Sequence, residues 1–278
     1  MTTVTLLAEN LARGEGILGE HGLSFWVKTG THKVLFDTGQ GLALEHNARR
    51  LGIDLTQADA IVLSHGHFDH VGGLEAVWPK ATKARLFLHP RATEPKWSGN
   101  GPGGSARHIS REYVETSAFR LPGREVVFTA EPVEVVPGVF TTGAVPRETG
   151  YEDTGGPFFL DKNLMRPDPL EDEVALWIPG ADGVTLLSGC AHAGIVNTLR
   201  RVEKLSGGKP VKLLVGGLHL EAASPERLAR TFDELRARPA LRLAFCHCTG
   251  PSAGRALWRE FPDRCLHAHA GAVFALGE

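Results

Sequence analysis

The sequence predicts an α/β fold whose strands carry a functional site at their ends. The continuous apolar run Ala60–Leu63 is typical of a strand buried on both faces, and it leads directly into a histidine-rich segment. Strands and helices alternate again in the C-terminal third, where three more predicted strands each end in a histidine-bearing loop, at His192, His219 and His247. Side chains gathered at strand ends are the usual layout of a site on an α/β scaffold.

The N-terminal third begins with a short apolar strand, Val4–Leu7. The runs Leu23–Val27 and Lys33–Phe36 predict a β-hairpin that turns through Gly30. Apolar residues at helical spacing in Leu42–Leu51 then predict an amphipathic helix.

The C-terminal third repeats the pattern of a strand followed by a helix. Val184–Leu187 is a predicted strand, and one apolar stripe along Ile195–Leu205 indicates a helix. Lys212–Val215 is the next strand. A serine cap followed by proline at Ser224-Pro225 then predicts a helix start, and Leu241–Phe245 is the last strand.

The middle of the chain, about residues 90–175, reads as irregular loops rich in glycine and proline. Neither a short repeat nor a clear linker divides the sequence. We therefore expect residues 1–278 to form one domain with irregular inserted loops.

Charge and hydropathy disfavour two classes of function, nucleic-acid binding and membrane binding. The net charge is −2 over 278 residues, and no run of lysine or arginine appears, which disfavours nucleic-acid binding through a broad basic surface. No apolar run reaches the roughly 20 residues that span a bilayer, and the start of the chain carries no signal-like segment. We expect a cytoplasmic protein with reduced cysteines that acts on a small molecule and binds no membrane. A homo-oligomer is left open.

The segment Ser64–Gly73 is the most informative. His65 and His67 are two residues apart in an extended loop and project to the same side, so they can share one metal, while Asp69 and His70 can face a second. Imidazole and carboxylate ligands suit Zn²⁺, and also Mn²⁺ or Fe²⁺. Three histidines and an aspartate within six residues are far more specific than a single histidine pair.

This segment resembles the H-x-H-x-D-H motif of the metallo-β-lactamase superfamily without a gap. Asp37, in Phe36-Asp37-Thr38-Gly39, looks like the superfamily's D-T-G turn, which supports the site from behind. The resemblance implies a four-layered αβ/βα sandwich of two mixed sheets flanked by helices. More narrowly, Ser188–Asn197, Gly216–Leu220 and His247–Gly250 look like the 7,8-dihydropterin-6-methyl-4-(β-D-ribofuranosyl)-aminobenzene-5′-phosphate synthase-like subgroup, which implies a pterin- and phosphate-bearing ligand.

One position departs from the superfamily pattern. Where its hydrolases usually place a bridging aspartate, this chain has Cys190, with His192 two residues on. Three alternatives follow: His192 completes the first site, Cys190 supplies a thiolate, or the second metal is weakly held. We favour His192, because a third imidazole gives a three-ligand site with an open position, and read Cys190 as a small buried residue.

His247 is our choice for the last ligand of the second site, beside Asp69 and His70, with His219 as the competitor. If His219 is not a ligand, it is expected to line the pocket and hydrogen-bond the substrate, the alternative being a structural histidine. A separate Cys246/Cys248 centre is less attractive, since two thiols underfill a zinc site. Other histidines, including His21, His46, His267 and His269, are read as surface or terminal residues.

A bound zinc lowers the pKa of its water from 15.7 to about 7, which predicts hydrolysis by a metal-bound hydroxide, with Asp69 as orienting group or general base. The expected substrate is a small phosphoester. The alternatives are a pterin-condensing enzyme and a pterin- or phosphate-binding protein without turnover. Candidate substrate contacts are the helix start at Thr249–Ser252, the side chains of Arg107, His108 and Arg147, and the aromatic rings of Phe158 and Phe159. For each arginine, a solvated surface charge is the more ordinary reading.

Overall fold

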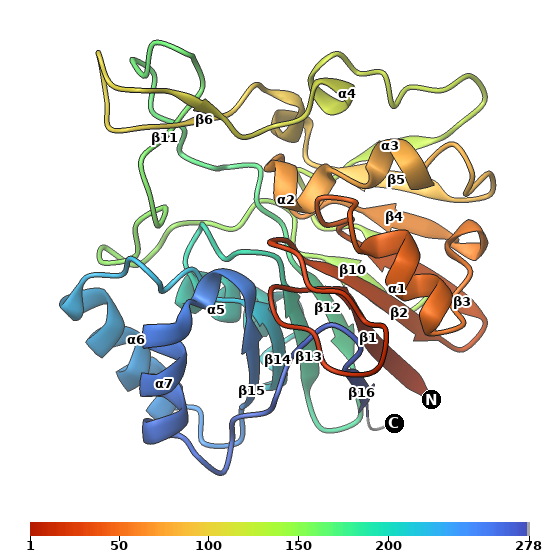
Figure 1. The fold of residues 1–278 in the computed structure, drawn as a ribbon. Helices are drawn as coiled ribbons and strands as arrows, with labels where there is room; N and C mark the ends of the chain where they lie inside the picture. The colour runs from red at the N-terminus through yellow and green to blue at the C-terminus, as the bar shows by residue number, and fades with distance from the viewer. Residues whose placement is uncertain (277–278) are drawn as a thin grey trace.

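The computed structural model describes residues 1–276, which form two mixed β-sheets packed face to face with helices outside them (Figure 1). Across the first sheet the described strands run in the order β16 (Val273–Leu276), β1 (Thr2–Ala8), β2 (Ser24–Thr29), β3 (His32–Phe36), β4 (Ala60–Val62), β5 (Arg85–Leu88) and β8 (Val126–Phe128). Across the second they run β15 (Arg242–Cys246), β14 (Val211–Gly217), β13 (Val184–Ser188), β12 (Leu176–Pro179), β10 (Val139–Thr141) and β9 (Glu134–Val136). A small third sheet joins β11 (Phe158–Phe159), β6 (Trp97–Ser98) and β7 (Arg107–His108).

Helices cover the outer face of each sheet. On the first sheet lie α1 (Leu44–Arg50), α2 (Phe68–Val71), α3 (Leu74–Val77) and α4 (Glu112–Glu115), with short 3-10 turns at Leu55–Gln57 and Pro90–Thr93. On the second lie α5 (Ile195–Leu205), α6 (Pro225–Arg236) and α7 (Pro251–Glu260), the last preceded by a 3-10 turn at His247–Thr249. Figure 1 shows these two helical layers on opposite sides of the paired sheets.

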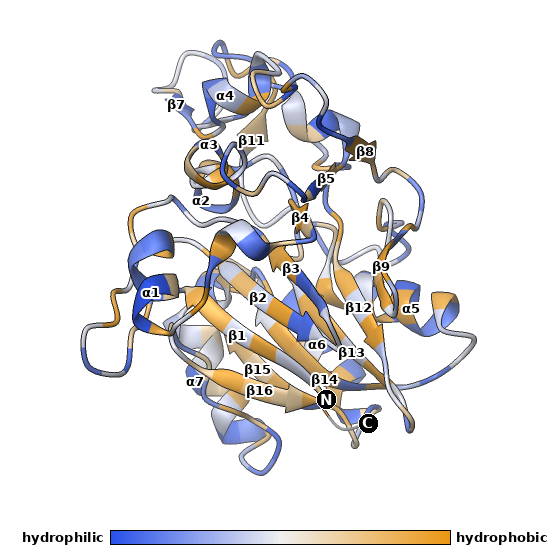
Figure 2. Cartoon of the chain, turned by 90° about the vertical axis from the view of Figure 1, so that its right-hand side faces the viewer, coloured by the Kyte–Doolittle hydropathy of each residue, from blue (hydrophilic) through white to orange (hydrophobic). Residues whose placement is uncertain are grey.

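Side-chain alternation along the strands builds this layering. In β1, Val4 and Leu6 enter the apolar cluster between the two sheets, whereas Leu7 packs into the cluster beneath α1 and α3. The strand is therefore apolar on both faces. Figure 2 shows hydrophobic colouring along much of β1 and β2. The predicted αβ/βα sandwich of two mixed sheets flanked by helices is confirmed.

The predicted elements recur with small shifts in their ends. The hairpin β2–β3 pairs antiparallel, α5 spans Ile195–Leu205 as expected, and the Ser224 side chain caps α6 by accepting from the Arg227 amide. The middle of the chain holds more structure than its composition indicates, because β8, β9 and β10 join the main sheets. Within residues 1–276, no helix is long and apolar enough to cross a membrane.

The topology brings four histidine-bearing loops together. β4 is parallel to β3 and β5 in the first sheet, and β13, β14 and β15 are parallel in the second. His65, His192, His219 and His247 follow the carboxyl ends of β4, β13, β14 and β15. Their loops meet at one edge of the sandwich, where rings from both sheets stand within about 5 Å of one another.

Candidate metal centre

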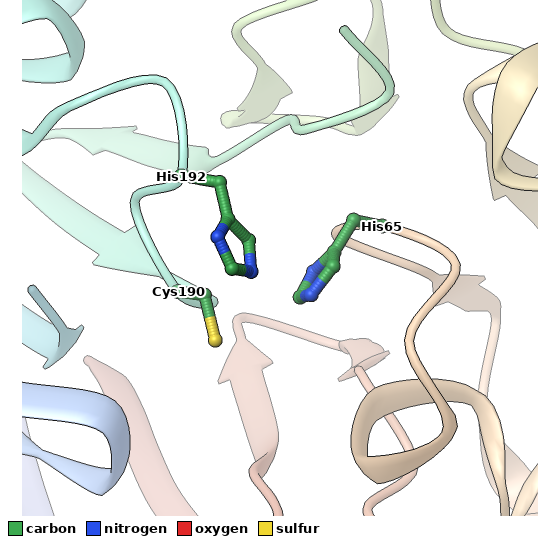
Figure 3. A group of neighbouring side chains, drawn as sticks. All are labelled: His65, Cys190 and His192. Carbon is green, nitrogen blue, oxygen red and sulfur yellow. The ribbon is translucent and has the colours of Figure 1, made fainter. Parts of the chain in front are cut away.

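Three buried imidazoles form the first donor set. The ring centroids of His65 and His67 lie 4.5 Å apart, those of His65 and His192 4.8 Å, and those of His67 and His192 4.9 Å. The Nε2 atom of each is buried and has no hydrogen-bond partner among residues 1–276. Leaving one buried polar atom unpaired costs free energy, so three unpaired Nε2 atoms on rings this close together indicate a cation site. Figure 3 shows the His65 and His192 rings facing each other, with the Cys190 thiol close to both.

The protonation states of this set suit metal binding. Burial lowers the pKa of His67 to about 3 and brings the pKa values of His65 and His192 well below their usual range. All three are therefore neutral imidazoles at pH 7. Neutral imidazole is the form that coordinates metals.

Asp69, His70 and His247 form the second donor set. The Nε2 atoms of His70 and His247 are 3.2 Å apart, and His247 Nε2 is 3.4 Å from Asp69 Oδ2. Ligand atoms around one tetrahedral zinc, each at about 2.0–2.1 Å from it, stand roughly 3.3 Å apart. The Cys190 Sγ atom is 3.2 Å from His70 Nε2. The spacing and chemistry of these donors therefore fit a divalent cation.

Electrostatics around this set favour positive charge. Burial alone would lower the pKa of His70, yet the carboxylates of Asp37 and Asp69 raise it to about 9. Burial would raise the pKa of Asp69, but His70, His21 and His247 hold it well below its usual range. Asp69 is therefore ionised at neutral pH, as a metal ligand must be.

Asp37 orients both sets from behind. Its Oδ2 atom accepts from His70 Nδ1 at 2.7 Å and from the Ser64 hydroxyl at 2.7 Å, and that hydroxyl accepts from His65 Nδ1 at 2.9 Å. Each ring thus donates through Nδ1 and directs Nε2 to the centre, where a bound cation would displace the Nε2 proton of His70. Asp37 has a φ of 59°, a strained backbone conformation of the kind that clusters at functional sites.

Asp37→Asn is expected to weaken metal binding by about 10- to 100-fold, because the amide no longer holds the imidazole with a charged acceptor. Competition with a chromophoric chelator measures the affinity. Asp182→Asn, an exposed carboxylate on another loop, is the matched control and should bind metal as the wild type does. Equal affinities for the Asp37→Asn and wild-type proteins would contradict the orienting role.

Two further contacts fix the ligands that come from the second sheet. His192 Nδ1 donates to the Thr154 carbonyl at 2.8 Å, and His247 Nδ1 donates to Asn10 Oδ1 at 3.0 Å. The His247 backbone amide also donates to Glu9 Oε1 at 2.7 Å. Four of the five ligand-type histidines are thus locked in one ring orientation by their Nδ1 atoms.

A buried ion cluster supports the turn between His65 and His67. Lys96 Nζ contacts Asp168 Oδ2 at 2.8 Å and Asp172 Oδ1 at 3.0 Å, and all three side chains are almost fully buried. The other Asp172 oxygen accepts from the Gly66 amide at 2.8 Å. A Cβ at Gly66 would clash with the Ala92 carbonyl and the Lys96 stem, so this position needs glycine.

The two sets open into a cavity of about 510 Å³. Four donor residues line it: His67, Asp69, His192 and His247. The rest of its wall includes Phe68, Phe158, Arg107 and Glu221. His219 also lines it, with its ring centroid 4.2 Å from that of His192. Its buried Nδ1 atom has no partner among the described residues, and burial lowers the pKa of His219 to about 4. His219 thus faces the cavity as a neutral imidazole beside the first set.

The structure brings the metal ligands expected from the sequence to one edge of the sandwich. It brings together all six expected metal ligands, with His247 in the second set and His219 outside it: His65, His67, Asp69, His70, His192 and His247. Cys190 Sγ lies near both sets. Cys246 is buried between the sheets, whereas Cys248 lines the cavity, so the two do not face a common centre.

Three further residues make contacts that the sequence did not predict. His21 is exposed, as expected of a surface residue, but its Nε2 atom is 3.2 Å from Asp69 Oδ2 and it lines the cavity. Arg147 is exposed, as expected of a surface charge; its guanidinium donates to the Pro169 and His192 carbonyls, and it does not line the cavity. His108 pairs with Glu115 away from the donor sets.

Of the aromatic residues and the helix start that were expected to contact the substrate, only one lines the cavity. Phe158 lines the cavity, whereas Phe159 is buried and does not. α7 begins at Pro251 as expected, but its first turn does not line the cavity. The Lys96 cluster, Asn10 and Glu9 were missed, because nothing in their local sequence spacing marks them.

Comparison with known proteins agrees with this geometry. The sequence profile of the metallo-beta-lactamase superfamily matches residues 18–247. The 7,8-dihydropterin-6-methyl-4-(beta-D-ribofuranosyl)-aminobenzene-5'-phosphate synthase of Methanocaldococcus jannaschii is 32% identical over 270 residues, which cover 91% of this chain and 89% of that protein.

Two solved structures are similar over almost the whole chain. Tm1679, a metal-dependent hydrolase of the beta-lactamase superfamily, gives a TM-score of 0.83 at 28% identity, with both chains covered completely. Zn²⁺-bound PqqB from Methylobacterium extorquens gives 0.56 at 14% identity over 99% of this chain and 100% of that one, a likeness of fold alone. With its profile match, its relatives and its two buried donor sets, the chain belongs to the metallo-β-lactamase superfamily.

Proposed function

We propose that this protein is a metal-dependent hydrolase that acts on a small phosphoester-type substrate. The observation that carries the proposal is the pair of buried donor sets, several of whose members line one cavity. His65, His67 and His192 would hold one cation, and Asp69, His70 and His247 a second. When bound, Zn²⁺, or Mn²⁺ or Fe²⁺ in its place, supplies Lewis acidity and a nucleophile at neutral pH.

The side chains around the cavity have separate tasks. Asp69 is ionised and lies at the cavity wall, so it can orient the nucleophile and accept its proton. His219 is neutral at pH 7 and can donate a hydrogen bond from Nδ1 to a substrate oxygen. Arg107 supplies positive charge for a phosphate, and Phe158 offers an apolar face beside His67 and His192.

A second candidate is condensation of a pterin with a ribosyl-aminobenzene phosphate. It is supported by the 32% identity to the Methanocaldococcus jannaschii synthase over 91% of the chain. The same cavity would then hold two substrates, and Phe158 would contact an aromatic ring. Binding of a pterin without turnover is the non-catalytic version of this candidate.

Elemental analysis of protein purified without chelator or affinity tag, combined with a bis-p-nitrophenyl phosphate assay, tests the proposal. About two zinc or manganese ions per chain, with turnover that a chelator abolishes and added metal restores, is the expected result. Metal without phosphodiester turnover, but with product formed from the pterin and the aminobenzene phosphate, would establish condensation instead. Tight pterin binding without hydrolysis or condensation would show that the protein binds a pterin and has neither activity.

Arg107→Ala is expected to raise the KM for an anionic phosphoester by about tenfold and to leave kcat nearly unchanged. A charge-assisted contact is worth about 1.5–3 kcal/mol, and the exposure of Arg107 to solvent places this contact at the lower end. Arg111→Ala is the matched control. Both guanidinium groups lie over the Phe68 ring, at 5.8 Å and 5.6 Å, but only Arg107 lines the cavity. Equal effects of the two substitutions on KM would rule out a specific phosphate contact at Arg107.

A further inference from the structure

The Cys190 sulfur lies close to donor atoms of both sets. This Sγ atom and the donor atoms of His65 and His192 all lie within 4.8 Å of one another, and the same limit holds for Cys190 with His70 and His247. Figure 3 shows the Cys190 thiol below the His192 ring, on the same side of the site as the two imidazoles. The sulfur therefore stands between the first and second sets.

The surrounding loop fixes that sulfur in place. Gly189 packs so closely on Ser64 that an added Cβ would clash with its side chain, and Ala191 has a φ of 61°. The Cys190 side chain is only 3% exposed. A small apolar residue would satisfy the packing at such a position, so burial alone does not account for a sulfur close to the donor atoms of four histidines.

Unpaired atoms around the sulfur point to a shared ligand. The Nε2 atoms of His65 and His192 are buried and lack partners among the described residues, and Cys190 Sγ is 3.2 Å from His70 Nε2. Thiolate sulfur is a strong ligand for zinc and for cobalt in the same site.

We propose that Cys190 is a ligand shared by both metal ions, its thiolate sulfur lying between the His65/His67/His192 set and the Asp69/His70/His247 set. This inference rests on the proposed function, because it requires a two-metal site. On metal binding the S–H bond breaks, the electron pair stays on sulfur and is donated to the metals, and the proton passes to solvent.

Cobalt(II) titration of the metal-free protein tests the inference without any assay of activity. We expect a sulfur-to-cobalt charge-transfer band in the near ultraviolet that grows over both the first and the second equivalent. In Cys190→Ser the band should be lost and bound cobalt should fall from about two to about one per chain. Cys190→Asp, which restores an anionic ligand, should bind about two ions without the band, and so separates ligand loss from misfolding.

Cys248→Ser is the matched control. Its sulfur also lines the cavity and lies 3.5 Å from the Cys190 carbonyl oxygen, yet this variant should keep the band. Loss of the band in Cys248→Ser, or a band that stops growing after one equivalent, would overturn the shared ligand. Two bound cobalt ions without any band would overturn it while the proposed hydrolase stands, whereas a wild-type protein that binds no cobalt, zinc or manganese would overturn both.

Discussion

Replacing His67 with alanine is expected to lower kcat/KM for phosphodiester hydrolysis by about 10³-fold or more. The first donor set would lose one of its three imidazoles, and a catalytic zinc site depends on its full set of protein ligands. Lewis-acid stabilisation of the transition state is worth several kcal/mol, and about 4 kcal/mol corresponds to three powers of ten in rate. Steady-state kinetics together with elemental analysis of the same sample measure both losses.

His32→Ala, a change at a partly exposed histidine in the β2–β3 hairpin, is the control and should behave as wild type. The stability of the metal-free protein separates a ligand from a structural residue. Because His67 Nε2 is buried without a partner among the described residues, its removal should cost the metal-free protein little beyond lost packing. Full turnover by His67→Ala, or unfolding of the metal-free variant, would contradict the role as a ligand.

Lys96→Met should have the largest effect on folding, a loss of about 3–5 kcal/mol in the free energy of unfolding. The substitution leaves the carboxylates of Asp168 and Asp172 buried without their cation. Breaking a buried ion pair by removing one partner is strongly destabilising for this reason. Urea unfolding of the metal-free protein, followed by circular dichroism, measures the change.

The triple variant Lys96→Met, Asp168→Asn, Asp172→Asn tests the physical cause. With both charges removed, it should recover much of the stability that the single variant loses. Lys162→Met, at an exposed lysine of the same irregular region, should change stability by less than about 0.5 kcal/mol. A single variant as stable as the wild type would show that the two carboxylates are not charged in the folded protein.

The fold and the core of the metal centre could be predicted because their signals are local. Apolar runs of strand length mark β4, β13, β14 and β15, and His65 to His70 lie within six residues of one another. A strand that ends in a histidine-bearing loop places that histidine at a sheet edge, whichever strands lie beside it. Parallel pairing then brings these loops together.

Contacts between segments that are distant in the sequence could not be predicted in this way. Lys96 contacts Asp168 and Asp172, which lie 72 and 76 residues further along the chain. The short strands and loops between them have no periodic pattern of apolar residues that would predict which side chains point inward. His21 stands beside Asp69 only because the segment before β2 crosses the end of α2. The choice between His219 and His247 likewise depended on where β14 and β15 end relative to the first sheet.

Each donor set takes members from both sheets: His65 and His67 with His192, and Asp69 and His70 with His247. A bound ion therefore clamps one half of the sandwich to the other, and by thermodynamic linkage the packing of the halves contributes to metal affinity. Substitutions deep between the sheets, such as Leu187→Ala, should then weaken metal binding without touching a ligand. The affinity for metal should then depend on the apolar core between the sheets as well as on the histidines that hold the ion.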